Sequence, residues 1–125
     1  MRGDRLLLDS VILIDHLNGL EQATAYLRGV LDASHVSAIT RAEVLAGLGS
    51  REVHLGKLLL DRFPLIPIDR PVADLAAELR REHRWRLPDA IQAAVARLHG
   101  LVFVTRNTRD FSPRRHRFVL VPYEA

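Results

Sequence analysis

The chain contains no cysteine, so disulfide bonds and thiolate metal sites are excluded. It also has no apolar run approaching the roughly 20 residues that a membrane-spanning helix needs. Arg2 and Arg5 precede a short apolar stretch, but Asp9, Ser10 and Asp15 interrupt it, which argues against a signal peptide. We therefore expect a cytoplasmic protein that does not associate with membranes.

Aromatic residues are also scarce, at 6% of the chain, whereas hydrophobic residues make up 48% and charged residues 26%. These proportions are typical of a globular domain with a real core. No linker, repeat or low-complexity segment divides the chain. With 125 residues, the sequence predicts a single domain spanning residues 1–125.

Lysine is almost absent: Lys57 is the only one, so arginine supplies nearly all the positive charge behind the net +3. A GC-rich genome is the simpler explanation of this bias. Clustering is more informative, because arginines gather in 80–86 and in 106–117. Arginine binds phosphate oxygens in a bidentate manner, so these clusters favour a polyanionic partner.

Short apolar runs alternate with stretches of helical periodicity along the chain. The expected strands are 5–8, 34–38, 65–68, 101–105 and 118–121. The expected helices are 11–17, 21–31, one that Thr40 caps and Gly47 ends, 51–62, 71–83 and 88–99. This alternation predicts an α/β fold with a mostly parallel sheet of about five strands and helices on both faces.

Four acidic or amide residues stand where an expected strand ends or an expected helix begins: Asp9, Glu43, Asp89 and Asn107. Ligands of open parallel sheets bind outside the carboxyl ends of the strands. The helix that opens at Pro88 runs antiparallel to the strand that follows it, so Asp89 also lies at that edge. All four side chains should therefore meet in one pocket.

Each of these residues also has a purely structural explanation. Asp9 is a good helix N-cap, Glu43 completes a capping box with Thr40, Asp89 suits a helix dipole, and Asn107 suits a turn. Only the set points to function. Clustered carboxylates need a compensating charge, and oxygen ligands favour Mg²⁺ or Mn²⁺. Such an ion activates water against a phosphodiester.

Four blocks of the sequence resemble motifs of the PIN-domain family, and specifically of VapC-type toxins of bacterial toxin–antitoxin pairs. The blocks occur in the family's order and cover nearly the whole chain: 8–15, 37–47, 88–94 and 105–111. The resemblance implies a PIN-like three-layer α/β/α fold. It also implies an Mg²⁺- or Mn²⁺-dependent endoribonuclease that hydrolyses RNA, forms a homodimer and is neutralised by a cognate antitoxin.

By this resemblance, Asp9, Glu43 and Asp89 are the metal-binding acids, and the fourth position falls on Asn107 or on Asp110. Asn107 brings no charge there. Val11 is a second departure, because the family more often has a small polar residue at that place. Both departures concern the rate more than the reaction.

Further candidates flank these acids and would orient them or contact substrate. They are Ser10, Thr40, Thr105, Arg106, Asp110 and Asp15. Asp15 faces either the pocket or solvent, and Asp110 is either a cap, an ion-pair partner of an arginine or a residue that positions water. Trp85 belongs to the core or an interface, or it stacks on a base.

Two alternatives to the nuclease remain open. The chain could retain the fold without the chemistry and bind RNA or protein as a catalytically weak module. It could also be a metal-dependent phosphatase or a DNA nuclease with similar pocket chemistry. For the antitoxin, four leucines could form an apolar groove or belong to the core: Leu55, Leu58, Leu59 and Leu60.

Overall fold

The computed structural model describes residues 4–124. Five short strands form one sheet: β1 (Leu6–Leu8), β2 (Ser34–Ser37), β3 (Leu65–Ile66), β4 (Val102–Val104) and β5 (Val119–Leu120). Their order is β3-β2-β1-β4-β5, and every neighbouring pair is parallel. The predicted fold class is confirmed.

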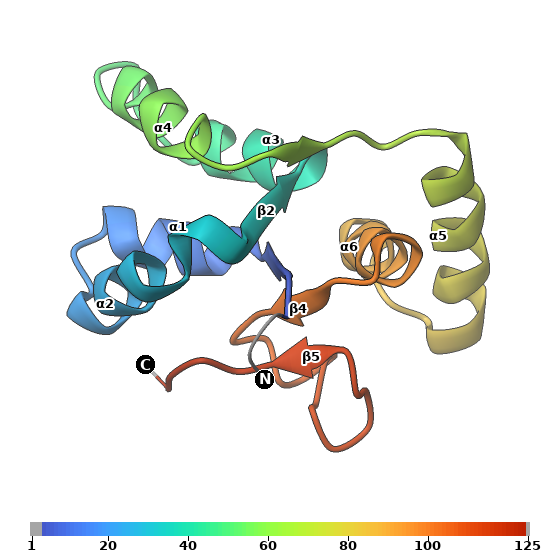
Figure 1. Ribbon diagram of the computed structural model, residues 1–125. Coiled ribbons are helices and arrows are strands. Elements are labelled where there is room, and N and C mark those ends of the chain that lie inside the picture. Colours follow the sequence, from blue (N-terminus) through green and yellow to red (C-terminus); the bar gives the residue numbers. More distant parts are fainter. Residues whose placement is uncertain (1–3, 125) are drawn as a thin grey trace.

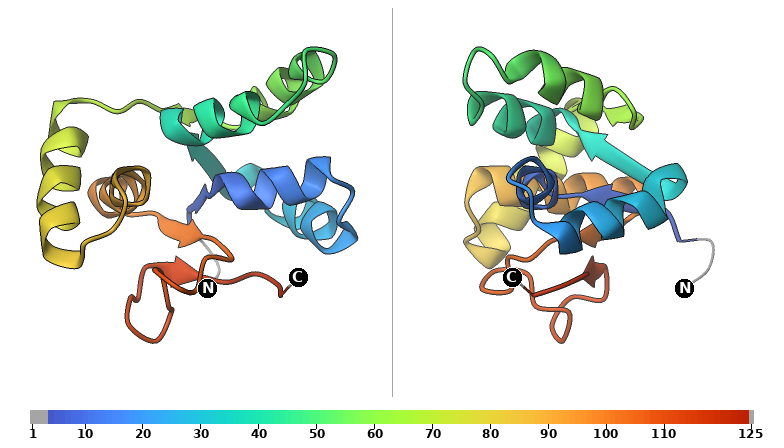
Figure 2. Two further views of the ribbon diagram at one scale, coloured as in Figure 1. Left: turned by 180° about the vertical axis from the view of Figure 1, so that it is seen from behind. Right: turned by 90° about the vertical axis from the view of Figure 1, so that its left-hand side faces the viewer.

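Six α-helices connect these strands: α1 (Ser10–Leu17), α2 (Glu21–Val30), α3 (Ala38–Ala46), α4 (Val53–Leu60), α5 (Arg70–His83) and α6 (Leu87–His99). A 3₁₀ turn, η1 (Leu31–Ala33), follows α2. Helices α1 and α2 lie on one side of the sheet, and α5 and α6 lie on the other (Figures 1 and 2). Within residues 4–124, no helix has the length and apolar character required to cross a bilayer.

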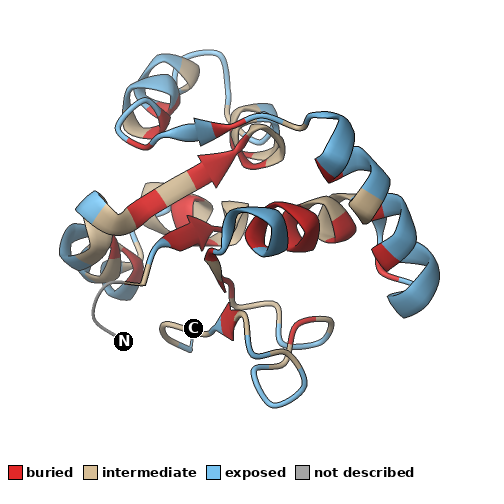
Figure 3. Cartoon of the chain, turned by 45° about the vertical axis from the view of Figure 1, so that its right-hand side comes forward, coloured by how far each residue is buried: buried red, intermediate tan, exposed pale blue. Residues whose placement is uncertain are grey.

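Two apolar clusters hold the three layers together. One joins α5 and α6 to the sheet through Leu7, Phe103 and Phe111. The other joins α1, α2 and α3 to the opposite face through Leu8 and Val36. Adjacent residues of β1 thus point into different layers, as strand geometry requires. Buried residues follow the strands and α6, while much of α5 is exposed (Figure 3).

The start of α3 differs from its prediction. Ser37, not Thr40, is the N-cap: its side chain accepts a hydrogen bond from the backbone N–H of Thr40 at 3.2 Å. Strand β2 runs directly into this helix without a loop. Glu43 therefore lies in the second turn of α3, and the predicted capping box between Thr40 and Glu43 is wrong.

The remaining boundaries differ by at most two residues at element ends. The third strand is shorter than predicted, ending at Ile66 before Pro67. The fourth helix begins at Val53, two residues after the predicted Arg51, because a turn precedes it. The predictions for α5 and α6 each miss one residue at the start, since Arg70 and Leu87 precede their prolines in the helix.

Candidate active site

The four predicted positions line one pocket of about 290 Å³ at the carboxyl edge of the sheet. Asp9 follows β1, Glu43 comes from α3, Asp89 is the third residue of α6, and Asn107 follows β4. Ser10, Val11, Arg86 and Arg106 complete the lining. The topological argument for convergence at this edge therefore agrees with the structure.

Asp9 is held from two sides. Its Oδ1 accepts a hydrogen bond from the backbone N–H of Ser10 at 2.8 Å, and its Oδ2 accepts one from the Thr105 hydroxyl at 2.6 Å. The contact with Ser10 makes Asp9 the N-cap of α1. Burial raises the pKa of Asp9, and the hydrogen bonds from Thr105, Ser10 and Gln92 oppose that rise.

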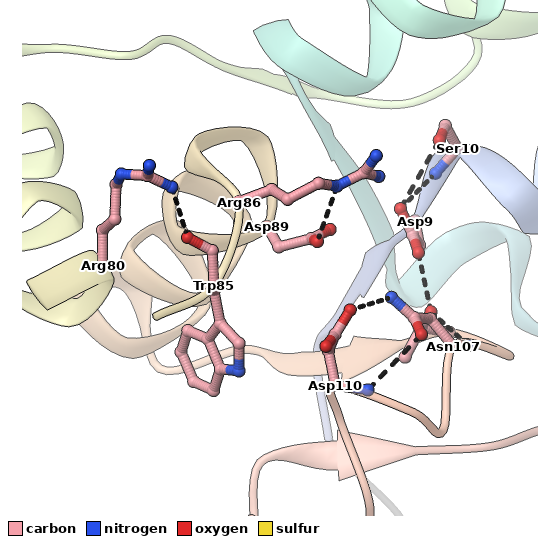
Figure 4. Close-up of polar contacts among 9 residues, drawn as sticks. Asp9, Ser10, Arg80, Trp85, Arg86, Asp89, Asn107 and Asp110 are labelled. Carbon is pink, nitrogen blue, oxygen red and sulfur yellow. Dashed lines mark hydrogen bonds and ion pairs between the residues drawn. The ribbon is translucent and has the colours of Figure 1, made fainter. Parts of the chain in front are cut away.

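Asp89 lacks such support. Its Oδ2 is buried and accepts no hydrogen bond within residues 4–124. The nearest cation is Arg86, whose Nε lies 3.7 Å from this oxygen on an otherwise exposed side chain (Figure 4). Burial raises the pKa of Asp89, and the negative charges of Asp9 and Asp110 raise it further, while Arg86 lowers it.

The Glu43 carboxyl belongs to the same electrostatic group. Burial raises its pKa, a hydrogen bond from Ser10 lowers it, and repulsion from Asp9 and Asp89 raises it again. Three carboxyl groups with raised pKa values form a pocket in which the ionised state is disfavoured. Such a pocket gains from a cation that offsets the buried negative charge.

The chemistry of the donors fits a hard divalent ion, chiefly because Asp89 Oδ2 is a buried oxygen that accepts no hydrogen bond within residues 4–124. Within residues 4–124, however, no three His, Cys, Asp or Glu side chains are grouped closely enough to hold one ion. Mg²⁺ commonly keeps several waters and takes only one or two protein carboxylates. The pocket suits that mode better than a closed protein cage.

Asn107 is bound to its own turn. Its Nδ2 donates to Asp110 Oδ2 at 3.2 Å, its Oδ1 receives the Asp110 backbone N–H at 3.5 Å, and its own N–H donates to the Thr105 hydroxyl at 3.0 Å. The Asp110 side chain therefore faces Asn107 (Figure 4). Asn107 lines the pocket, and Asp110 holds the Asn107 side chain in place through these hydrogen bonds.

Asp15 was predicted to face either the pocket or solvent, and it does neither. Asp15 is 9% exposed, and its carboxylate receives Arg106 in a bidentate ion pair, with distances of 2.7 and 2.9 Å. The Tyr123 hydroxyl donates to the same carboxylate at 2.9 Å. Arg106 thus reaches the pocket wall with much of its charge already paired.

A buried polar network was not predicted from the sequence. The Ser37 hydroxyl donates to Gln92 Oε1 at 2.7 Å, and Gln92 Nε2 donates to the Thr40 hydroxyl at 2.6 Å. Thr40 donates in turn to the Leu8 carbonyl, next to Asp9, at 3.2 Å. Thr40 therefore supports the site through the backbone, not by contact with a carboxylate.

Two further predictions concern side chains outside the pocket. Trp85 is 6% exposed and packs on Phe111, so it belongs to the core and offers no free face for a base. Of the four leucines considered for a groove, Leu60 is buried, whereas Leu55 and Leu58 are 61% and 53% exposed on α4. Leu59 lines a separate shallow pocket with Phe63.

The family model of the PIN domain matches residues 6–115 of the chain. A toxin–antitoxin complex from Klebsiella pneumoniae contains a similar chain, with 36% identity and a TM-score of 0.88 over 96% of this chain and 99% of that one. FitAcB from Neisseria gonorrhoeae has 28% identity and a TM-score of 0.78, covering 94% and 97%. DNA-bound VapBC from Salmonella typhimurium shares the fold at 22% identity, with a TM-score of 0.75 over 86% and 90%. No curated protein matches the sequence.

Proposed function

Since this chain belongs to the PIN-domain family, we propose that it is the toxin of a VapBC-type toxin–antitoxin pair and a metal-dependent endoribonuclease. The observation that supports this most strongly is the pocket itself. Asp9, Glu43 and Asp89 come from three separate elements and line one cavity, burial raises the pKa of each, and repulsion from Asp9 raises the pKa of Glu43 and of Asp89 further. That arrangement is costly without a cation.

In the proposed reaction, Asp9, Glu43 and Asp89 would hold Mg²⁺ or Mn²⁺, one or two of them directly and the rest through bound water. When bound there, such an ion would supply Lewis-acid polarisation of a phosphoryl oxygen and would offset negative charge in the transition state. Hydrogen bonds from Thr105 and Ser10 fix the orientation of the Asp9 carboxylate, which prepares it to bind the ion. Arg86, whose side chain is 82% exposed, can leave Asp89 and contact a substrate phosphate instead.

Cleavage of RNA with Mg²⁺ or Mn²⁺ tests this proposal. Asp9→Asn and Asp89→Asn should each lower the rate by about two orders of magnitude or more, because each removes a charge that faces the ion. Asp74→Asn is the matched control, since Asp74 is exposed on α5, and it should cleave like the wild type. Equal cleavage by all four proteins would identify the activity as a contaminant.

Substrate class is tested in parallel with DNA and with a phosphomonoester. We expect RNA to be cleaved and the monoester to be left intact, since the arginines that line the pocket favour a polyanion. Hydrolysis of the monoester alone would support a phosphatase instead.

A catalytically weak binding module is the second candidate. It is favoured by the neutral Asn107 at the fourth position, which is engaged with Asp110, and by the lack of a preformed three-ligand cluster within residues 4–124. A growth assay separates the two functions. If Asp9→Asn is as toxic as the wild type, binding suffices for toxicity.

The proposed partners are an antitoxin and a second copy of the chain. The chain from Klebsiella pneumoniae with 36% identity comes from a toxin–antitoxin complex, which supports the first. Leu55 and Leu58 give α4 an exposed apolar face suited to an antitoxin segment. Co-expression with the product of a neighbouring small reading frame should suppress toxicity and yield a stable complex.

A further inference from the structure

A second hollow lies beside the active site and has no part in the chemistry proposed above. Its volume is about 500 Å³, and its lining comes from the end of α5 and from the loop after β4: Glu82, His83, Arg84, Trp85, Arg109, Asp110, Arg115 and His116. Asp110 joins the two sites, because it lines this hollow and binds Asn107 of the active site at 3.2 Å.

The base of this hollow is an aromatic stack. The His83 ring lies on the Trp85 indole with a centroid distance of 4.1 Å and an angle of 13°. Trp85 is fixed from below by Phe111 at 4.8 Å, and its carbonyl accepts a hydrogen bond from Arg80 at 2.6 Å. His83 is therefore the outermost ring of this stack, with its side chain 33% accessible.

His116 forms the wall of the stack. Its ring meets Trp85 edge-on at 5.3 Å and His83 at 5.6 Å. Burial lowers the pKa of His116, and the nearby charges of His83 and Arg115 lower it further. Near neutral pH this wall is an uncharged aromatic surface, which a base can approach without displacing a hydrated cation.

The rim carries three arginines. The guanidinium groups of Arg84, Arg109 and Arg115 form no hydrogen bond or ion pair within residues 4–124. Arg84 is held at a positive φ of 58°, where it ends α5 by donating its N–H to the Arg80 carbonyl.

A flat aromatic stack beside unpaired guanidinium groups is the combination that binds single-stranded nucleic acid. The rim's negative side chains are already engaged, since Glu82 contacts His83 at 3.2 Å and Asp110 binds Asn107. An anionic ligand would therefore meet free positive charge. A nucleotide combines these two features in one unit, because its base presents a π face and its phosphate presents a negative charge.

We propose that this hollow binds one nucleotide of the single-stranded RNA substrate next to the cleaved bond. Its base stacks on His83, and its phosphate contacts Arg109 and Arg115. This inference rests on the proposed ribonuclease function and adds a substrate subsite to it.

The test measures binding, not cleavage. A short fluorescein-labelled 2′-O-methyl RNA is titrated with the protein in EDTA and followed by anisotropy. His83→Ala should weaken binding about tenfold through loss of stacking, whereas His83→Phe keeps an aromatic face and should stay within about twofold of the wild type. His99→Ala, an exposed histidine at the end of α6, is the control and should bind normally.

Salt dependence tests the phosphate contacts. Arg109→Gln and Arg115→Gln should each reduce the slope of log K against log salt by about 0.7, the value for one contact on a single strand. His83→Ala should leave the slope unchanged. Arg70→Gln is the matched control, because Arg70 lies at the opposite end of α5, roughly 20 Å from Arg84.

Normal RNA binding by His83→Ala, with an unchanged salt slope in both arginine variants, would overturn the proposal. So would loss of antitoxin binding in these variants with RNA binding intact, which would assign the hollow to a protein partner. Wild-type RNA binding that depends on His83 without any cleavage would instead refute only the ribonuclease. Thermal melting of each variant checks that the fold is retained.

Discussion

Gln92→Met should destabilise the fold although it nearly conserves volume. In the wild type, Gln92 accepts from the Ser37 hydroxyl at 2.7 Å and donates to the Thr40 hydroxyl at 2.6 Å. All three side chains are at most 2% exposed, so water cannot replace Gln92. The Ser37 hydroxyl would have only Thr40 Oγ1 within reach, at a weak 3.5 Å.

The magnitude follows from the groups left without partners. A buried donor without an acceptor costs about 1–3 kcal/mol, so we expect Gln92→Met to lose about 2 kcal/mol. Ser37→Ala should lose about 3 kcal/mol, of which about 1 is the lost N-cap of α3 and the rest the orphaned Gln92 oxygen. The double variant should cost only about 1 kcal/mol, the lost N-cap of α3, because neither partner is then left unpaired.

Urea denaturation followed by the fluorescence of Trp85, the only tryptophan, measures these differences. With a slope of about 1.5 kcal/mol per molar, a loss of 2 kcal/mol shifts the midpoint by roughly 1.3 M. Gln22→Met, at an exposed position of α2, is the control and should shift it little. Additive losses in the double variant would refute the coupling and the network on which it rests.

Two further predictions concern charge. Arg86→Gln should bind Mn²⁺ about threefold more tightly in calorimetry, because the guanidinium 3.7 Å from Asp89 no longer repels the ion; unchanged or weaker affinity would contradict this. Asp15→Asn should cost about 2 kcal/mol at pH 7, since Arg106 holds the pKa of Asp15 below its ordinary 3.8. A carboxyl group whose pKa is lowered by folding stabilises the fold above pH 3.8, and this contribution is lost as the pH falls through the pKa of the folded state. The difference in stability between Asp15→Asn and the wild type should therefore shrink toward about pH 3. A difference that widens as the pH falls would refute the pairing.

Each of these two charge variants has a matched control within the chain. Arg70→Gln removes a comparable exposed arginine far from the acids and should leave Mn²⁺ binding unchanged. Asp61→Asn breaks an exposed ion pair with Arg41, in which Asp61 is 62% accessible, and should cost less than about 1 kcal/mol at any pH.

Topology explains why the main site could be predicted from sequence. Asp9, Asp89 and Asn107 were assigned to strand ends or to a helix start, and each assignment needed only local patterns. The parallel sheet then places all such positions at one edge. Errors of one or two residues at element ends do not change that edge, so the pocket was predictable although several boundaries were not.

The error at α3 shows where local patterns fail. Ser37 and Thr40 are both residue types that cap helices, but only Thr40 has a Glu three positions later, so the local pattern favours the later start. Packing decides between them: Thr40 is drawn into contact with Leu8 and Gln92, residues 32 and 52 positions away in sequence. The partners of Asp15 are similar, because Arg106 and Tyr123 are 91 and 108 residues distant.

Gln92 escaped prediction for a related reason. It follows Asp89 by one helical turn on the buried face of α6, among alanines and Val95. A polar residue at an apolar position is a signal, since buried amides need partners. The sequence does not say which partners, and Ser37 and Thr40 lie on another element.

Capping and metal binding were offered as competing explanations for the acids, and the structure separates them residue by residue. Asp9 does cap α1, yet only its Oδ1 is used for that contact. Glu43 lies in the second turn of α3, so no capping box explains it. Asp89 stands in the first turn of α6, but the helix has no side-chain cap, and its Oδ2 is buried without a hydrogen bond. Secondary structure therefore accounts fully for none of the three, and at Asp89 it leaves a buried oxygen without a hydrogen bond, which a bound cation would satisfy.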